Sequence, residues 1–425
     1  MADDANKCPF AGAAAAAPGA DLPAHVPPEL VFEYEASLDA NTLDDPFSLT
    51  EEVRTKLPPV FFARSRSATM GGPGSWVCTR YEDIREVLQN NALYSSEGIF
   101  PFQTLVGETF RTVPNSYDPP EHDKYRLLLN PWFSPKEVNE LEPNIFRVVN
   151  ELIDGFVDKG ECDVAYGFGR IYPVKVFLDL MGFPPERFED FLDWGYAILH
   201  EMGNLERVKW GAKTAIAYLR SFVAEVRERP PADYLVSRLV YGKVEGRPLT
   251  DDELIGAMFF LWIAGLDTVA ATSTLMFRHL SLDTDLQQKL RENPDLIPEA
   301  VEEFLRMNPT VNSARAVKQD HELGGVQIKK GDRVSCLIAA GNFDPTEFED
   351  PRTFRTDRSS NRHLTFIAGA HRCLGSHLAR RELKIALAEF LRRIPPFRMK
   401  PGADRTVVPG LIAMRNLPLV WDVKG

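Results

Sequence analysis

The chain has 425 residues, of which 49 are basic and 61 acidic, so its formal net charge at pH 7 is −12. With 44% hydrophobic and 26% charged residues, its composition excludes collagen-like, disordered and fully membrane-embedded proteins. The acid excess, without any long basic run, argues against a nucleic-acid partner. The length allows several domains of about 150 residues, but no repeat or Gly/Ser linker divides the chain, so we expect one large domain.

The N-terminal sequence, MADDANKCPF, lacks the basic start and apolar stretch of a secretory signal. The 5 cysteines are an odd number and contain no C-x-x-C pair, which argues against a disulfide framework or a zinc knuckle. These features predict a cytoplasmic protein. Residues 11–20 are rich in alanine and interrupted by glycine and proline, so we expect a flexible arm over residues 1–27 and a folded domain over 28–425.

Two segments carry the pattern of a helix start. Residues 118–121 and 134–137 each combine a capping residue, Asp118 or Ser134, with a proline in the first turn and a glutamate three positions on. Near the C-terminus, apolar residues at helical spacing predict a helix from about Leu374 to Ile394. Strand signals are fewer, the clearest being a predicted hairpin with strands at 325–328 and 333–338 and a turn at 329–332. The expected fold class is mainly α with a minor β region.

Residues 255–277 form an apolar stretch long enough to span a membrane, with one formal charge. That charge, Asp267, lies in the middle, where a membrane span would pay about 3 kcal/mol for it. Upstream, Thr250 and Glu253 form a capping box, which marks a helix start in water. We therefore predict a long helix through the centre of a helical protein, apolar all round because neighbours surround it, and no membrane partner.

Cys373 ends a loop of small residues that leads into the last predicted helix. A helix N-terminus favours thiolate over thiol, and a thiolate binds a soft metal or haem iron. Gly369 and Gly375 allow the backbone to approach a flat ligand, and Phe366 can pack against it. The loop by itself leaves other interpretations open: a buried cysteine without a ligand, a zinc site shared with histidines 371 and 377, or the nucleophile of a hydrolase.

The pattern F-x-x-G-x-x-x-C-x-G, formed by Phe366, Gly369, Cys373 and Gly375, resembles the haem-binding loop of cytochrome P-450 monooxygenases. Other motifs of the family occur in order from about residue 28 onward, and the similarity is nearest to the soluble, camphor-hydroxylating bacterial branch. The resemblance implies a triangular prism of helices around a buried haem. The matching segments are D-P-P-E-H-x-x-x-R at 118–126, A-G-L-D-T at 264–268, E-x-x-R at 303–306 and D-R at 357–358.

The resemblance also implies roles for individual residues. It makes Cys373 the axial thiolate ligand of haem b (iron protoporphyrin IX), with Phe366, Gly369 and Gly375 in the cofactor loop. Asp267 and Thr268 are expected to supply protons for the activation of O2. The haem propionates are expected to be held by His122, Arg126, Arg315 and His371. Ser313 stands where the camphor-hydroxylating relative has an acidic residue.

The E-x-x-R pair receives opposite interpretations from periodicity and from the family. Periodicity places Glu303 and Arg306 on the exposed face of their helix, as a weak surface ion pair. The resemblance instead implies a structural role for them in a buried network with Arg358, and we follow the resemblance.

The family's substrate-pocket positions are mostly apolar here, which predicts a dry cavity for a compact molecule such as a terpenoid. Phe110 replaces the tyrosine that binds the camphor ketone, so camphor itself is not expected. The pocket positions are Phe110, Phe260, Ile263, Gly265, Val311, Leu411 and Ile412.

Electrons must come from separate proteins, because the chain carries no flavin or iron–sulfur motif after the cysteine loop. The resemblance implies a [2Fe–2S] ferredoxin and an NADH-linked reductase, which would dock on a positive face near Arg126 and Arg372. We expect a monomer. The alternatives are a haem-thiolate sensor, a peroxygenase without ferredoxin-driven turnover, and a zinc or thiol hydrolase.

Overall fold

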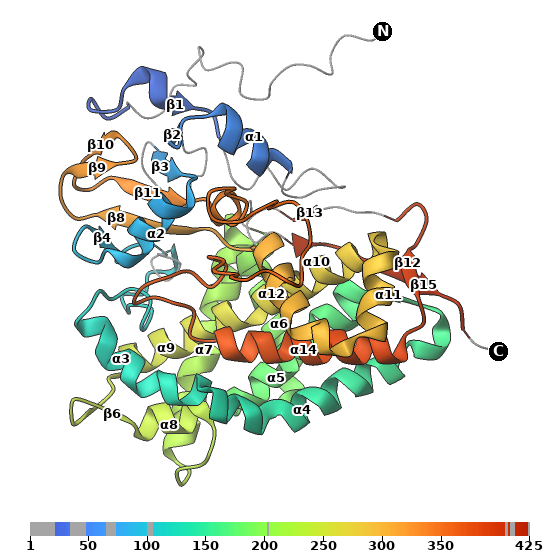
Figure 1. Cartoon of the computed structure of the whole chain (residues 1–425). Helices are drawn as coiled ribbons and strands as arrows, with labels where there is room; N and C mark the ends of the chain where they lie inside the picture. The colour runs from blue at the N-terminus through green and yellow to red at the C-terminus, as the bar shows by residue number, and fades with distance from the viewer. Residues whose placement is uncertain are drawn as a thin grey trace.

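The computed structural model describes residues 22–34, 48–64, 74–99, 105–201, 204–403, 407–408 and 413–423. Helices dominate, and the largest sheet lies toward one end of the molecule with α2 beside it (Figure 1). One hydrophobic core fills the space among the long helices, and a second lies between the sheet and α2. The predicted fold class, mainly α with a minor β region, is confirmed.

The helices of the described residues are α1 (Ser48–Lys56), α2 (Tyr81–Gln89), α3 (Glu121–Leu129), α4 (Pro135–Asp154), α5 (Ile171–Met181), α6 (Phe188–His200), α7 (Leu205–Arg227), α8 (Leu235–Tyr241), α9 (Asp251–Leu266), α10 (Thr268–Leu282), α11 (Thr284–Glu292), α12 (Ile297–Met307), α13 (Ile338–Asn342) and α14 (Ser376–Arg393).

The strands of the described residues are β1 (Val31–Phe32), β2 (Val60–Arg64), β3 (Gly74–Cys78), β4 (Tyr94–Ser95), β5 (Glu161–Asp163), β6 (Lys243–Val244), β7 (Arg247–Pro248), β8 (Ser313–Val317), β9 (His321–Leu323), β10 (Val326–Ile328), β11 (Arg333–Cys336), β12 (Phe397–Met399), β13 (Val407–Val408), β14 (Ala413–Met414) and β15 (Pro418–Trp421). The largest sheet has the order β1-β2-β3-β11-β8-β4, and a smaller sheet has the order β12-β15-β5.

The helix pair α9–α10 runs through the larger core. Its start follows the sequence: the Thr250 hydroxyl accepts a hydrogen bond from the Glu253 amide (3.2 Å), and the Glu253 carboxylate accepts one from the Thr250 amide (2.7 Å). By length and composition alone, the stretch Asp251–Leu282 could cross a membrane, but 67% of its most apolar window is buried inside the protein. These residues therefore form the central helix that the sequence predicted.

The predicted hairpin at 325–338 is wrong in its pairing. Strand β10 pairs with the preceding strand β9, and the turn falls at Gly324 and Gly325, both with positive φ, where glycine is favoured. Strand β11 instead pairs with β3 and β8. The 329–332 segment is the bend between the two sheets, held where the Asp332 carboxylate accepts hydrogen bonds from the Lys329 amide and the Trp76 indole, both at 2.9 Å.

Two expected chain features also differ from the structure. Ser134 caps α4 as predicted, but Asp118 does not cap α3, because its carboxylate accepts a hydrogen bond from the Ser96 amide (3.0 Å) instead. The expected flexible arm over 1–27 is too long at its C-terminal end. Within the described residues, Val26 is buried and the His25 ring contacts Asp332 (2.8 Å), so the packed chain includes residues from Leu22 onward.

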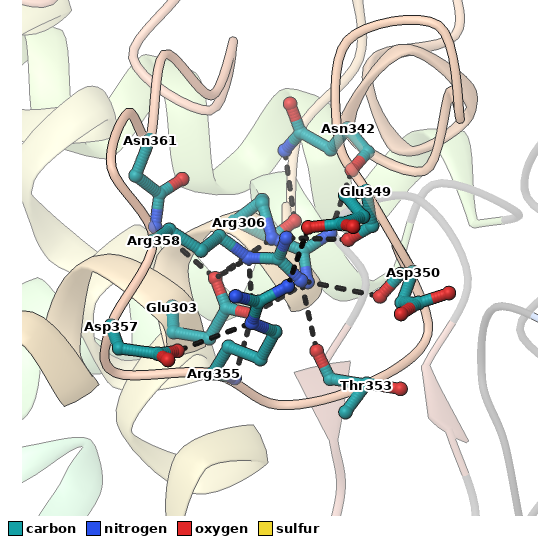
Figure 2. Close-up of polar contacts among 10 residues, drawn as sticks. All are labelled: Glu303, Arg306, Asn342, Glu349, Asp350, Thr353, Arg355, Asp357, Arg358 and Asn361. Atoms are coloured by element: carbon teal, nitrogen blue, oxygen red, sulfur yellow. Dashed lines mark hydrogen bonds and ion pairs between the residues drawn. The ribbon is translucent and has the colours of Figure 1, made fainter.

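A buried network ties α12 to the irregular segment that precedes the cysteine loop (Figure 2). Glu303 and Arg306 have fully buried side chains and form two hydrogen bonds of 2.7 and 2.8 Å. The Arg358 guanidinium adds bonds of 2.9 and 3.1 Å to the same carboxylate, and the Arg355 amide and the Asn361 side chain add bonds of 3.1 Å. The exposed surface pair that periodicity favoured is therefore wrong.

The sequence pattern misplaced this pair because a charged group is buried only where partners match it, and these partners come from 52 to 58 positions away along the chain. Burial raises the pKa of Glu303, but hydrogen bonds and positive charge from Arg306 and Arg358 outweigh it and hold that pKa below its usual value. Glu303 therefore stays ionised inside the protein.

We expect Arg306→Ala to lower the free energy of unfolding by about 3–5 kcal/mol, because it leaves the Glu303 carboxylate buried beside an incomplete set of partners. Urea denaturation followed by circular dichroism measures this. Arg355→Ala is the matched control, since its exposed guanidinium pairs with Asp357 and Glu349 and only its backbone amide reaches Glu303. Equal losses in the two variants would contradict the importance of the buried pair.

Candidate functional site

The Cys373 loop is a compact turn between the Glu303 network and α14. The Cys373 amide donates to the Phe366 carbonyl (2.9 Å), and the Arg372 amide donates to the Gly369 carbonyl (3.1 Å). Gly369 has a φ of +76°, and a Cβ there would lie 2.4 Å from the Leu88 carbonyl oxygen, so this position requires glycine. The loop thus fixes the Cys373 backbone next to that of Phe366.

Helix α14 begins at Ser376, so Cys373 lies just before its first turn. The residue is exposed to solvent, and desolvation by the protein around it raises the pKa of its thiol. The Gly375 amide and the charges of Arg126, Arg380 and Arg372 act in the opposite direction and lower that pKa. Burial and these nearby groups therefore act in opposite directions on the pKa of the thiol.

A second charged group, which the sequence pattern did not reveal, supports the loop from behind. Arg380 on α14 binds both carboxylate oxygens of Glu302 at 2.6 and 2.8 Å, and its guanidinium lies 4.5 Å from the centre of the Phe366 ring. The Glu302 carboxylate also accepts a hydrogen bond from Nε2 of the His363 ring, at 3.2 Å. Helices α12 and α14 therefore hold Phe366 in place through a cation–π contact.

Four predicted side chains, from α3, β8 and the loop itself, gather at the cysteine loop. The rings of His122, on α3, and His371 lie 4.3 Å apart, and the Arg126 guanidinium donates to the Arg372 carbonyl (2.9 Å). Arg315, on β8, donates to Ser313 (2.9 Å). The charge of Arg315 reaches His371, which places these residues in one electrostatic cluster.

The cluster combines two guanidinium cations with two histidines, and among the described residues the one carboxylate that hydrogen-bonds to it is Asp123, which contacts His122. Burial, together with the charges of His122 and Arg315, lowers the pKa of His371 to about 3. Burial also lowers the pKa values of His122 and Arg315. One ring or guanidinium nitrogen on each of His122, His371 and Arg315 is buried without a hydrogen-bond partner. Such a site is suited to bind anionic oxygens.

The central helix is interrupted at Asp267, between α9 and α10, where the backbone has φ −116° and ψ −15°. The Thr268 hydroxyl donates to the Ala264 carbonyl (3.0 Å), the back-bond that the sequence suggested. Ala264 is exposed although most of this helix is buried, so water-accessible space reaches its middle. The Asp267 carboxylate contacts the His200 ring at the end of α6.

The predicted pocket residues do not share one environment. Val311 is 42% exposed, and Phe260 and Ile263 are partly exposed. Phe110 is only 2% exposed and packs against Phe259, with ring centres 6.0 Å apart. Gly265 allows α5 to pack closely, since a Cβ there would lie 2.8 Å from the Phe177 ring. Leu411 and Ile412 lie outside the described residues.

Sequence reasoning missed His200 as well as the Glu302, His363 and Arg380 group. His200 lies 67 positions from Asp267, and His363 lies 61 positions from Glu302. No local spacing links such residues, because the fold alone brings them together. A signal was available only for Arg380, which lies on the predicted helix after the cysteine.

A thiol loop, a buried cationic cluster and an interrupted central helix in a helical fold are the parts expected of a haem-dependent oxygenase. The family model described as "Cytochrome P450" matches residues 204–418. A protein of Sinorhizobium fredii named "Probable cytochrome P450 127A1" is 37% identical over 94% of this chain and 97% of its own length. "Mycinamicin IV hydroxylase/epoxidase" of Micromonospora griseorubida is 32% identical over 82% of this chain and 90% of its own length.

Solved structures agree with these relatives. The crystal structure of CYP101J2 superposes with a TM-score of 0.83 at 31% identity, covering 95% of this chain and all of that chain (100%). CYP109E1 from Bacillus megaterium, solved in complex with testosterone, has a TM-score of 0.80 at 31% identity and covers 90% of this chain and 100% of its own. The chain therefore belongs to the cytochrome P450 family and is a monooxygenase of that family, which implies haem as cofactor and O2 as co-substrate.

The residues present fit a haem. Its two propionates would supply the anionic oxygens that the cationic cluster lacks, and they would satisfy the unpartnered nitrogens of His122, His371 and Arg315. A Cβ built on Gly375 meets nothing within 4 Å, so the backbone beside Cys373 leaves room for a flat group. The thiol, the open backbone and the cations thus lie together on one side of the fold.

The two loop glycines yield a matched pair of variants. We expect Gly369→Ala to lower the free energy of unfolding by about 1–3 kcal/mol, because alanine is strained at this positive φ and its Cβ meets the Leu88 carbonyl. Gly375→Ala has an ordinary φ of −79° and open space for its Cβ, so we expect little loss of chain stability but faster haem loss. Chemical denaturation measures the free energy of unfolding, and haem transfer to apomyoglobin measures the rate of haem loss. Identical results for the two variants in both measurements would contradict these separate roles.

Proposed function

We propose that Cys373 is the thiolate ligand of the haem iron and that His122, Arg126, Arg315 and His371 hold the propionates. The observation that carries this proposal is the set of buried, unpartnered nitrogens of His122, His371 and Arg315 beside an accessible thiol. Once bound, the iron accepts electron density from the thiolate and supplies the O–O cleavage chemistry of this family. The nearby charges of Arg126, Arg372 and Arg380 favour the ionised sulfur that such a ligand requires.

The test of this assignment is the spectrum of the reduced holoenzyme under carbon monoxide. We expect the wild type to show the long-wavelength Soret band of a thiolate-ligated haem, and Cys373→Ala to lose it, because no other sulfur ligand replaces the thiolate. Cys162→Ala is the control, since that cysteine lies on β5, outside the loop. A Cys373→Ala protein that retains the band contradicts the proposal.

Within the same site, we propose that Thr268 and Asp267 deliver protons during O2 activation. The helix break removes Asp267 from regular helical structure and leaves its side chain only 14% exposed. Thr268 keeps its hydroxyl at the break by donating to the Ala264 carbonyl, and it can donate instead toward a ligand in the adjacent open space. A buried carboxylate beside a hydroxyl forms a short path for general acid catalysis.

We expect Thr268→Ala to keep consuming NADH and O2 but to release most of the reducing equivalents as hydrogen peroxide, because the hydroxyl that guides proton transfer is lost. Thr272→Ala is a matched control, since this threonine makes the same type of back-bond one turn later, to the Thr268 carbonyl (2.8 Å), and is 5% exposed. The ratio of peroxide to NADH measures coupling. Unchanged coupling in Thr268→Ala would refute the role.

The substrate we propose is a compact apolar molecule, such as a terpenoid or a similar cyclic compound. The support is the apolar side chains of Phe260, Ile263 and Val311, which retain accessible surface. Phe110 offers no hydroxyl, and it contacts Phe259 in the core. Recognition by shape rather than by hydrogen bonds follows from this lining.

A panel of monoterpene hydrocarbons, alcohols and ketones tests this class through the low-to-high-spin Soret shift. We expect hydrocarbons to bind wild type at least as tightly as ketones of the same skeleton, and Phe110→Tyr to favour the ketones by about tenfold, the value of one hydrogen bond of about 1 kcal/mol or more. Phe259→Tyr is the neighbouring control. No response to any terpenoid would exclude the substrate class, whereas unchanged ketone binding in Phe110→Tyr would exclude its contact with the substrate.

For electron supply we propose a [2Fe–2S] ferredoxin and an NADH-dependent reductase in the cytoplasm, acting on a monomer. Arg126 and Arg372, which is exposed, lie next to Cys373 and provide positive charge for an acidic partner despite the net charge of −12. This local arrangement is what supports a docking face on the thiolate side.

A further inference from the structure

His200 ends α6 and contacts the one residue that interrupts the central helix. Its Nε2 contacts Oδ2 of Asp267, and the two side chains are 2% and 14% exposed. The pair therefore joins α6 to the break between α9 and α10. No role in the family resemblance is attached to this position of the chain.

The type of side chain that contacts Asp267 determines whether it can exchange protons with that carboxylate. A lysine or arginine at this place would hold Asp267 charged but would release no proton near neutral pH. Imidazole has two ring nitrogens and an ordinary pKa near neutrality, so it can receive a proton on one side and release one on the other. The Nδ1 atom of His200 is buried and has no hydrogen-bond partner among the described residues, which leaves it available as the receiving side.

The surroundings of His200 are polar on the outer side. The Tyr196 ring lies 5.0 Å from the His200 ring, and the Arg170 guanidinium lies 5.4 Å from the Tyr196 ring centre. The neighbouring Glu201 is engaged with Arg207 at 2.7 Å, so it does not compete for the imidazole through that bond. An aromatic ring and a guanidinium group thus lie next to the His200 ring on the α6 side of the contact.

We propose that His200 is a positioning residue that holds Asp267 at the helix break and supplies it with protons. In the transfer step the Nε2–H bond breaks and the proton moves to Oδ2 of Asp267, while Nδ1 takes up a proton from solvent. Asp267 then passes its proton toward Thr268 and becomes a carboxylate again. Once the His200 side chain rotates away from Asp267, Nε2 takes up a proton from solvent and Nδ1 releases one, which restores the starting tautomer. This inference rests on the proposed role of Asp267.

The experiment compares His200→Gln, His200→Phe and Asp267→Asn holoenzymes with wild type. Each receives NADH, a [2Fe–2S] ferredoxin and its reductase, and O2 uptake is measured in H2O and D2O without added substrate. The reaction O2 + NADH + H⁺ → H2O2 + NAD⁺ consumes protons in every case. We expect His200→Phe and His200→Gln to slow uptake by roughly ten- to a hundredfold and to enlarge the solvent isotope effect, since one acid–base group contributes about 10²–10⁴.

Glutamine separates positioning from proton transfer, because its amide can donate to Asp267 but cannot change protonation. Full activity in His200→Gln with loss in His200→Phe would overturn the proton-transfer part. Normal uptake in both variants, together with slow uptake in Asp267→Asn, would overturn the inference alone. Normal uptake in Asp267→Asn would instead refute the proposed role of Asp267.

A spectroscopic readout does not depend on turnover. In the diamagnetic ferrous–carbonyl holoenzyme with ¹⁵N-labelled histidine, we expect the His200 ring resonances, assigned by their loss in His200→Gln, to shift in Asp267→Asn. Unshifted resonances would overturn the contact on which the proposal rests. His321→Gln is the control, since His321 contacts Tyr94 at 2.7 Å and lies far along the chain from the helix break.

Discussion

The carboxylate of Glu303 is the interaction on which the rest of the site depends. It lies on α12, fully buried, and it receives hydrogen bonds from Arg306, Arg358, Asn361 and the backbone of Arg355. A lone charge in this place would be too costly to bury, so the partners and the fold require one another. Because Arg355, Arg358 and Asn361 belong to the irregular segment before the cysteine loop, one buried charge fixes a stretch that has no regular secondary structure of its own.

Hydrogen bonds of Asn342 connect this network to the cysteine loop. Asn342 donates to the Arg306 carbonyl and to Thr365, both at 2.9 Å, and accepts a hydrogen bond from the Leu364 amide at 2.7 Å. The residue after Thr365 is Phe366, whose carbonyl accepts a hydrogen bond from the Cys373 amide. Contacts from α12 as well as from α14 therefore hold the Cys373 loop. This explains why a loop with two glycines can still keep the thiol at a defined position.

The two charged clusters of the molecule differ in how their charges are matched. Around Glu303 the buried carboxylate is shared by two guanidinium groups of the same chain, Arg306 and Arg358. Around His371 the cations exceed the carboxylates, and nitrogens of His122, His371 and Arg315 lack partners. A folded protein tolerates such a deficit where a ligand removes it, because unsatisfied buried groups cost about 1–3 kcal/mol each. The first cluster thus supports the fold, and the second accounts for the binding of an anionic group.

Local sequence patterns predicted features that depend on neighbours within a few residues. The capping box of Thr250 and the cap of Ser134 are of this kind, since donor and acceptor lie three positions apart. The partner of the strand after Gly325 was mispredicted. Gly324 and Gly325, which precede this strand, form a better turn than residues 329–332, so the strand pairs with the one before it. The pairing of Glu303 with Arg358, and of Asp267 with His200, depends on tertiary structure that no spacing encodes.

The helix break shows why the most informative residue can also be the one that breaks the pattern. Asp267 is the single charge in an otherwise apolar stretch, and a continuous helix would leave it without a partner among hydrophobic neighbours. Its departure from helical geometry lets α6 supply a polar contact, and Thr268 satisfies its own hydroxyl within the helix. The chain therefore has a weaker central helix, and the exposed Ala264 lies within one turn of the break.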